Sequence, residues 1–300
     1  MKTFRLTAVI CLILLLTLAS ACTGASNGAD GTLGGEPGGT LGTADPQGDP
    51  VSPTNEILIT FDGNSYQASQ SGVVSVSGNV LSIVKPGTYR LKGTLANAQI
   101  RIAVEKTEAV DLIFDGLSVT NAHNAPFYVD SADKVSITLA EGSQNTLTDA
   151  TNYIFPAGED KPNACLYSSE DLTIKGTGAL TVIASFNNGI GCKNDLKIKG
   201  GTITVEAVNN ALKGNESIQI SGGSLSLKGT DGLKSDSTLE GEGIVEITGG
   251  TVELNCSDDG IQASNQITIT DGARVTVEAL DDDLKCDGTA FVAQGSLISK

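Results

Sequence analysis

Acid and amide residues recur at fixed positions in five polar turns in the second half of the chain. Each turn ends in an Ile or Leu, and the residues two positions before it are Asn188, Asn210, Asp231, Asp259 and Asp282. The residues three positions before it are Asn187, Asn209, Thr230, Asp258 and Asp281. If the turns stack on one another, each of these two sets becomes a column of neighbouring side-chain oxygen atoms. The amides come first in each column and the carboxylates follow.

The amide half of these columns predicts a structural ladder. Stacked Asn side chains donate hydrogen bonds to one another and to the backbone of the turn, so they need no ligand. The residues of this predicted ladder are Asn187, Asn188, Asn209 and Asn210.

The carboxylate half has no N–H group with which to do the same. Two like charges one layer apart repel by about 1 kcal/mol in water and by about 4 kcal/mol at an effective dielectric constant near 20. Ca²⁺ would remove this repulsion, because it binds about six to eight hard oxygen ligands. The predicted calcium ligands are Asp231, Asp258, Asp259, Asp281 and Asp282, with Asp236 and Asp283 as further candidates.

Lysine residues offer a second source of counter-charge. The column directly after the aligned Ile or Leu contains Lys213, Lys234 and Lys285, which could pair with the acids or contact an acidic ligand. A third possibility is a solvated acidic surface without a bound ion. The sequence has no Gly-Gly-x-Gly-x-Asp repeat, so a calcium roll of that type is not indicated.

These polar turns belong to a repeated unit of strands and turns, which must position them. Units with the order strand, Gly-rich turn, strand and polar turn span 195–212, 217–233, 245–261 and 266–284. Their first strands align at Leu196, Ile218, Val245 and Ile267, which are 22, 27 and 22 residues apart, and the longer interval contains the insert 238–243. Apolar residues alternate within each strand, so each strand has one inward and one outward face.

Strands this short are stable only when they stack. The pattern predicts an all-β fold, a right-handed parallel β-helix (solenoid) of roughly nine coils with about 22 residues per coil. A β-sandwich would need hairpin turns in place of this period. We expect residues 54–87 to cover the N-terminal end. The sequence stops in mid-coil at Lys300, so the C-terminal edge of the stack is either exposed or covered by a partner.

The N-terminus predicts export and anchoring. Residues 1–21 have the basic start, the short apolar run and the small residues of a signal peptide. Cys22 follows directly and resembles the acylated cysteine of a bacterial lipoprotein, although an ordinary Ala-x-Ala cleavage site is the alternative. Residues 22–53 are rich in Gly, Asp and Pro and predict a flexible tether, and residues 54–300 form the β-helix domain. We therefore expect an extracellular, lipid-anchored protein.

The charge of the chain limits its partners. Removal of a leader with Lys2 and Arg5 lowers the 19 basic residues to 17, against 35 acidic residues, for a net charge of −18. Such a surface disfavours nucleic acid and anionic lipid and favours divalent cations. The expected contact with a membrane is through the lipid anchor only.

The chain resembles the bacterial carbohydrate-binding β-helix proteins, whose fold is similar to that of pectate lyases. The stretches that carry the resemblance include GTYRLKGTL (87–95), VDLIFDGLSVTNAHNAPFYV (110–129), PNACLYSSEDLTIKGTGALTV (162–182) and DDGIQAS (258–264). The resemblance implies a secreted calcium-binding protein that recognises plant cell-wall polysaccharide, with pectic chains and cellulose as candidate ligands. The Asp-Gly-Ile motif is replaced by Asn210-Ala211-Leu212 and by Asp283-Leu284, which weakens this implication at those two turns.

Three functions are compatible with these features. The favoured one is a calcium-dependent binding protein for polysaccharide, and acidic chains fit best because the sequence has no Trp for stacking on crystalline cellulose. A calcium-dependent polysaccharide lyase is the alternative, and it would need a neutral Lys or an Arg as base. Acids around Lys234 and Lys285 would raise a lysine pKa and so oppose this role. A structural surface spacer is the third.

Overall fold

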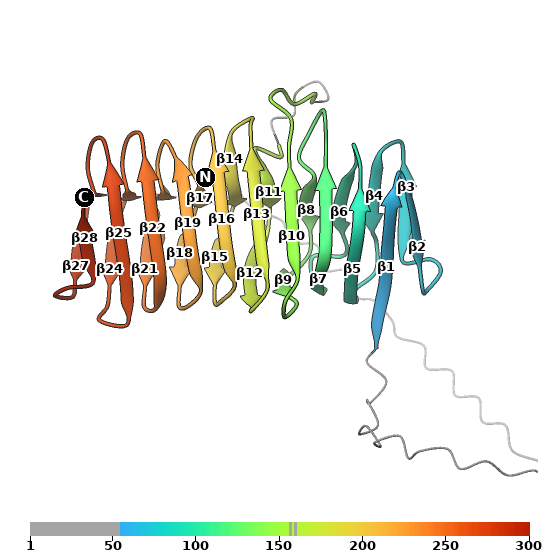
Figure 1. Ribbon diagram of the computed structural model, residues 1–300, viewed down its shortest axis with the longest axis horizontal. Coiled ribbons are helices and arrows are strands. Elements are labelled where there is room, and N and C mark those ends of the chain that lie inside the picture. Colours follow the sequence, from blue (N-terminus) through green and yellow to red (C-terminus); the bar gives the residue numbers. More distant parts are fainter. Residues whose placement is uncertain (1–54, 156–157, 159–160) are drawn as a thin grey trace, which may run out of the picture. The chain divides into compact units, whose positions relative to one another are not determined.

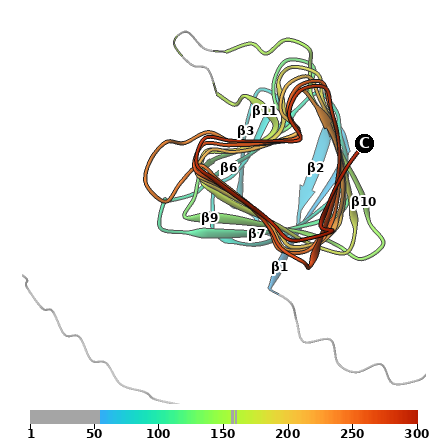
Figure 2. The same cartoon turned by 90° about the vertical axis from the view of Figure 1, so that its left-hand side faces the viewer.

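The computed structural model describes residues 55–155, 158 and 161–300, which form a parallel β-helix of about nine coils. The predicted fold class is thereby confirmed. The coils stack along one axis (Figure 1) and superpose on one another when they are seen along that axis (Figure 2). The predicted signal peptide, Cys22 and the tether lie outside the described residues. Within the described residues, no helix is long and apolar enough to span a bilayer.

The strands form two sheets. The larger sheet consists of β1 (Glu56–Gly63), β2 (Ser65–Ala68), β5 (Gly87–Leu95), β7 (Ala109–Thr120), β9 (Lys134–Leu139), β10 (Gln144–Thr148), β12 (Asp171–Gly176), β13 (Ala179–Ala184), β15 (Asp195–Ile198), β16 (Thr202–Ala207), β18 (Ser217–Ile220), β19 (Ser224–Gly229), β21 (Ile244–Ile247), β22 (Gly250–Cys256), β24 (Gln266–Ile269), β25 (Ala273–Ala279), β27 (Thr289–Val292) and β28 (Leu297–Ser299). The smaller sheet consists of β3 (Val74–Ser77), β4 (Val80–Ile83), β6 (Gln99–Ala103), β8 (Phe127–Ser131), β11 (Ala164–Ser168), β14 (Asn188–Cys192), β17 (Leu212–Gly214), β20 (Leu233–Ser235), β23 (Ile261–Ala263) and β26 (Leu284–Cys286).

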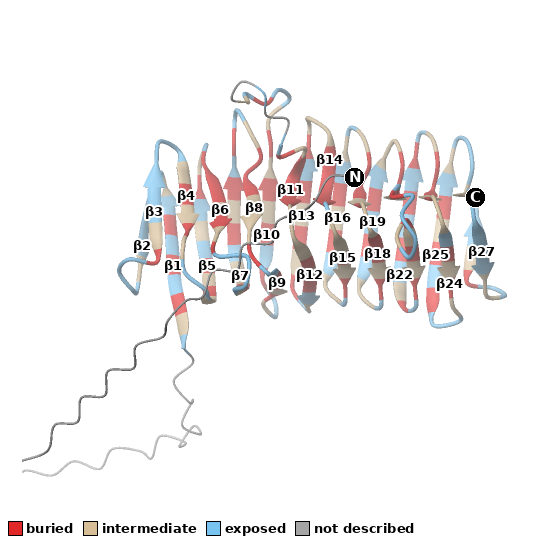
Figure 3. Ribbon diagram, turned by 180° about the vertical axis from the view of Figure 1, so that it is seen from behind, coloured by how far each residue is buried: buried red, intermediate tan, exposed pale blue. Residues whose placement is uncertain are grey.

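The core is a column of aliphatic side chains inside the coils. Parallel pairing places Leu172, Leu196, Ile218, Val245 and Ile267 directly above one another, and none of them is exposed to solvent. Figure 3 shows the same alternation of buried and exposed residues along the strands. Burial of this column is what makes strands of three to six residues stable in a stack.

The two ends of the stack differ. At the N-terminal end, β1 pairs with β2 and β3 pairs with β4 in antiparallel fashion, so hairpins cover the first coil. At the other end, β27 and β28 pair on one side only within the described residues, and Phe291 and Ile298 are exposed. A partner on this edge stays a prediction.

Glycines at the corner between the first two strands of four successive coils fix the turn. Gly176, Gly201, Gly223 and Gly250 all have φ between 86° and 103°, a conformation that L-residues rarely adopt. At Gly223, a Cβ atom would lie 2.9 Å from the carbonyl oxygen of Gly201 in the coil before it. The close stacking of these corners therefore depends on the absence of a side chain.

A pair of substitutions tests this dependence. We expect Gly223→Ala to lower the free energy of unfolding by about 2 to 4 kcal/mol, through backbone strain and overlap together. The control is Gly241→Ala, because Gly241 has a φ of 81° but open space around its Cα, and strain alone should cost about 1 kcal/mol. Urea denaturation of the two variants measures the difference, and equal losses would contradict the role of close stacking.

Candidate functional site

The acid and amide columns lie on the turns that lead into the strands of the smaller sheet. Backbone hydrogen bonds connect each turn to the next, from Asn209 N to Asn187 O (3.0 Å), from Thr230 N to Asn209 O (2.7 Å) and from Asp258 N to Thr230 O (2.9 Å). The turns are thus stacked in register, and the side chains of each column are neighbours.

The amide half forms a hydrogen-bonded ladder. Asn210 Nδ2 donates to Asn188 Oδ1 at 2.7 Å, and Asn209 Nδ2 donates to Asn187 Oδ1 at 2.9 Å. Asn188 Nδ2 in turn donates to the backbone oxygen of Asn163 at 3.0 Å. These four side chains hold the turns together.

The ladder is interrupted where the column changes from amide to acid. Asn210 and Asp231 are both 2 % exposed, and the Oδ1 atom of Asn210 is buried with no hydrogen-bond partner among the described residues. The next side chain in the column is the carboxylate of Asp231, which has no N–H to donate. Further along, only backbone N–H groups continue the pattern, from Asp259 to Asp231 Oδ1 and from Asp282 to Asp259 Oδ1, both at 3.3 Å.

Lysines provide part of the missing positive charge. Lys234 Nζ lies 2.9 Å from Asp231 Oδ2, and Lys285 Nζ lies 2.8 Å from Asp259 Oδ2. The hydrogen bond to Asp259 raises the pKa of Lys285 above its ordinary value. The buried carboxylates Asp231 and Asp259 therefore each have one ammonium partner.

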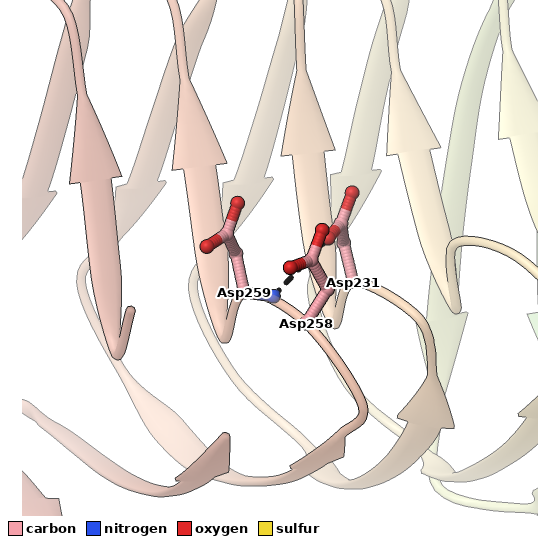
Figure 4. A group of neighbouring side chains, drawn as sticks. All are labelled: Asp231, Asp258 and Asp259. Atoms are coloured by element: carbon pink, nitrogen blue, oxygen red, sulfur yellow. Dashed lines mark hydrogen bonds between the residues drawn. The ribbon is translucent and has the colours of Figure 1, made fainter. Parts of the chain in front are cut away.

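Two groups of carboxylates lie close together on these turns. The Asp231 group contains Asp231, Asp258 and Asp259, and the Asp281 group contains Asp259, Asp281 and Asp282. In each group one oxygen atom per residue lies within 4.8 Å of the others. Figure 4 shows the first group, in which Asp258 and Asp259 come from one turn and Asp231 from the turn before it.

This donor set fits a calcium ion. Two oxygens bound to one Ca²⁺ at about 2.4 Å lie no more than about 4.8 Å apart, and carboxylate and amide oxygens are the ligands that Ca²⁺ prefers. Asn210 Oδ1, which accepts no hydrogen bond from the described residues, is one such oxygen. Gln262 Oε1, which is buried and also unpaired among the described residues, is another in the same part of the sheet.

Of the predicted calcium ligands, two lie apart from both groups. Asp236 forms an ion pair with Lys213, with 2.6 Å between Nζ and Oδ2. Asp283 accepts a hydrogen bond from the hydroxyl of Ser299. The structure therefore brings five of the seven predicted carboxylates together.

Two features near these turns were not predicted from the sequence to be part of the site. Gln262 follows Lys234 and precedes Lys285 in the outward row of the smaller sheet, and its place in that column was the available signal. The rings of Tyr153 and Phe186 stack with their centroids 4.0 Å apart, although 33 positions separate them in the sequence. No spacing rule connects a residue in an insertion with one in a regular turn.

Comparisons with known proteins agree with the fold. The profile of the carbohydrate-binding domain-containing protein family matches residues 77–297. A carbohydrate-binding domain-containing protein from Acetivibrio thermocellus is 44% identical over 262 residues, which cover 86% of this chain and 91% of that protein. A solved structure described as a polysaccharide lyase-like protein from C. thermocellum, in a gadolinium derivative, is 45% identical and has a TM-score of 0.79. The match covers 82% of this chain and 99% of that one.

Proposed function

Because this chain belongs to the carbohydrate-binding domain-containing protein family, we propose that it binds plant cell-wall polysaccharide in a calcium-dependent manner, with acidic pectic chains as the preferred ligand. The observation that carries the proposal is the pair of carboxylate groups on one rigid row of turns, beside lysines that face outward. A neutral glycan would gain nothing from this arrangement of charges.

Calcium would be held by the Asp231 group and the Asp281 group. Bound there, the ion supplies positive charge and open coordination positions for the carboxylate of a uronate. The protein's own part is to hold its carboxylates on stacked turns, so that little conformational entropy is lost when the ion arrives. The solved relative was described as a gadolinium derivative, and gadolinium is also a hard cation that seeks oxygen ligands.

Binding is favoured over cleavage by the positions of the basic residues. A lyase needs a base near the metal to remove a proton from the sugar. Lys234 and Lys285 are engaged in ion pairs with Asp231 and Asp259. Arg90, on β5, pairs with Glu56 and so lies in the N-terminal coils.

The remaining two arginines are no better placed for a lyase. Arg101 lies on β6 and pairs with Asp130, and Arg274 lies exposed on β25 of the larger sheet.

Outside the cell, lipidation of Cys22 would hold the protein at the membrane surface while the β-helix meets the polymer.

Retention on immobilised polygalacturonate tests the proposal. We expect the purified protein to be retained in millimolar calcium and its retention to fall at least tenfold in excess chelator, about 1.4 kcal/mol or more. A neutral glucan serves as the control matrix and should retain little protein in either buffer. The same mixtures are monitored for ultraviolet absorbance from unsaturated products. Equal retention in chelator would contradict the calcium dependence, and rising absorbance would show that the protein is a lyase.

A further inference from the structure

A second polar site lies on the smaller sheet, next to the carboxylate groups but built from different residues. It is a pocket of about 270 Å³ whose lining includes Lys161, Lys193 and Lys213 together with Asn163 and Asn215. Among the described residues, its lining contains no Asp or Glu, although the chain as a whole has a net charge of −16. The pocket is therefore a local concentration of positive charge on an acidic protein.

Gly191 forms the floor of the pocket. Parallel pairing places it in one outward row between Tyr167 on β11 and Lys213 on β17. A Cβ atom on Gly191 would lie 2.9 Å from the Cβ of Ala164 and 3.2 Å from Cδ2 of Tyr167. The neighbouring side chains therefore leave no room for a side chain at this position, and the pocket lies over Gly191 between Tyr167 and Lys213.

The charges of the three lysines are not equally available. Lys213 is held by Asp236 at 2.6 Å. Lys161 and Lys193 are exposed, and neither forms a salt bridge with a carboxylate of the described residues. The ammonium group of Lys161 lies 5.7 Å from the centroid of the Tyr167 ring, which places it over the pocket wall.

We propose that this pocket binds one anionic sugar residue, a uronate, through its carboxylate and without calcium. Lys193 and Lys161 donate charge-assisted hydrogen bonds to the carboxylate. The amide groups of Asn163 and Asn215 form hydrogen bonds with the sugar hydroxyls. This inference rests on the proposed function, because it names a subsite for the same class of ligand.

The pocket continues directly into the calcium site along the axis of the β-helix. Its row runs from Gly191 through Lys213 to Lys234, Gln262 and Lys285, one residue per coil and about 4.8 Å per step. Lys234 and Lys285 are the partners of Asp231 and Asp259. A polyuronate that follows this row contacts the pocket first and the carboxylate groups after it, so binding at one site raises the effective concentration at the other.

Calorimetric titration with trigalacturonate in excess chelator tests the pocket by itself. We expect the parent protein to bind this oligomer and the double variant Lys161→Gln, Lys193→Gln to bind at least about tenfold more weakly, because two hydrogen bonds to a charged group are lost. The matched control is Lys175→Gln, Lys199→Gln, which removes the same charge from two exposed lysines elsewhere on the coils and should bind as the parent does. A neutral trisaccharide of the same length should not bind.

The outcomes separate this inference from the proposed function. If polygalacturonate is retained in calcium but trigalacturonate does not bind in chelator, the assignment of uronate binding to the pocket is wrong and the proposed function stands. If the oligomer binds in chelator but the polymer is not retained in calcium, the pocket stands and the proposed function is wrong. Equal binding by the lysine variant and the parent, or by the neutral trisaccharide, would overturn the inference.

Discussion

Replacement of Asp258 and Asp259 by asparagine should lower the affinity of the protein for calcium at least about 100-fold. Asp259 belongs to both carboxylate groups, and Asp258 belongs to the first. Asparagine keeps the shape and one oxygen but removes two of the charges that attract the ion. Loss of groups that merely orient a ligand already costs about 10- to 100-fold in metal affinity, and in the proposed site these two residues are the ligands themselves. Calorimetry with calcium measures the change.

The matched control is the variant Asp236→Asn, Asp283→Asn. It removes the same charge from the same set of coils, but both residues lie outside the two carboxylate groups. It also leaves Lys213 without its carboxylate partner, as the first variant leaves Lys285. Calcium affinity close to that of the parent is expected for the control. Parent-like affinity in the first variant, or an equal loss in both, would show that the ion is bound elsewhere.

The repeat was predictable because it follows from local features of the sequence. Alternation of apolar residues with a period of two assigns the inward face of every strand, and a nearly constant interval between strands requires stacked coils. The positions of Ile218 and Val245, 27 residues apart with an insert between them, still align because the insert leaves the stack as a loop. The columns of acids and amides follow from this register without any knowledge of side-chain contacts.

The contacts within the site were not predictable in the same way. Lys234 pairs with an acid of its own coil, whereas Lys285 pairs with one from the coil before it. Both lysines occupy the same column, so the choice depends on side-chain conformation and on the neighbouring charges. The pocket above Gly191 likewise joins residues from three successive coils, and only the folded register places Tyr167, Gly191 and Lys213 in one row.

The lysine pairs also bear on how tightly calcium can bind. In the structure the ammonium groups of Lys234 and Lys285 already neutralise Asp231 and Asp259. An ion that enters must share these carboxylates or displace the ammonium groups, and the energy of the ion pairs is then subtracted from the binding energy. Asn210 Oδ1 is different, because no group of the described residues satisfies it. If calcium binds here as proposed, coordination by Asn210 Oδ1 would break no hydrogen bond to a described residue.

Replacement of Asp231 by asparagine should therefore have opposite effects in chelator and in calcium. In chelator we expect the free energy of unfolding to rise by about 1 kcal/mol, because the new amide can donate to Asn210 Oδ1 and a buried unsatisfied acceptor costs about 1 to 3 kcal/mol. The loss of the ion pair with Lys234 offsets only part of this gain, since a partly exposed pair contributes at most about 1 kcal/mol. In calcium at 100 times its dissociation constant, the parent gains about 2.7 kcal/mol that the variant largely lacks.

Chemical denaturation of parent and variant in the two buffers measures this reversal. The control is Lys234→Gln, which breaks the same ion pair without supplying an amide to Asn210, and it should be less stable than the parent in chelator. A variant Asp231→Asn that is less stable than the parent in both buffers would mean that the ion pair with Lys234 outweighs the unsatisfied oxygen. A variant that gains as much from calcium as the parent would remove Asp231 from the ligand set. The reversal itself requires that one column of side chains serve two purposes, with amides that hold the turns and carboxylates that hold the ion.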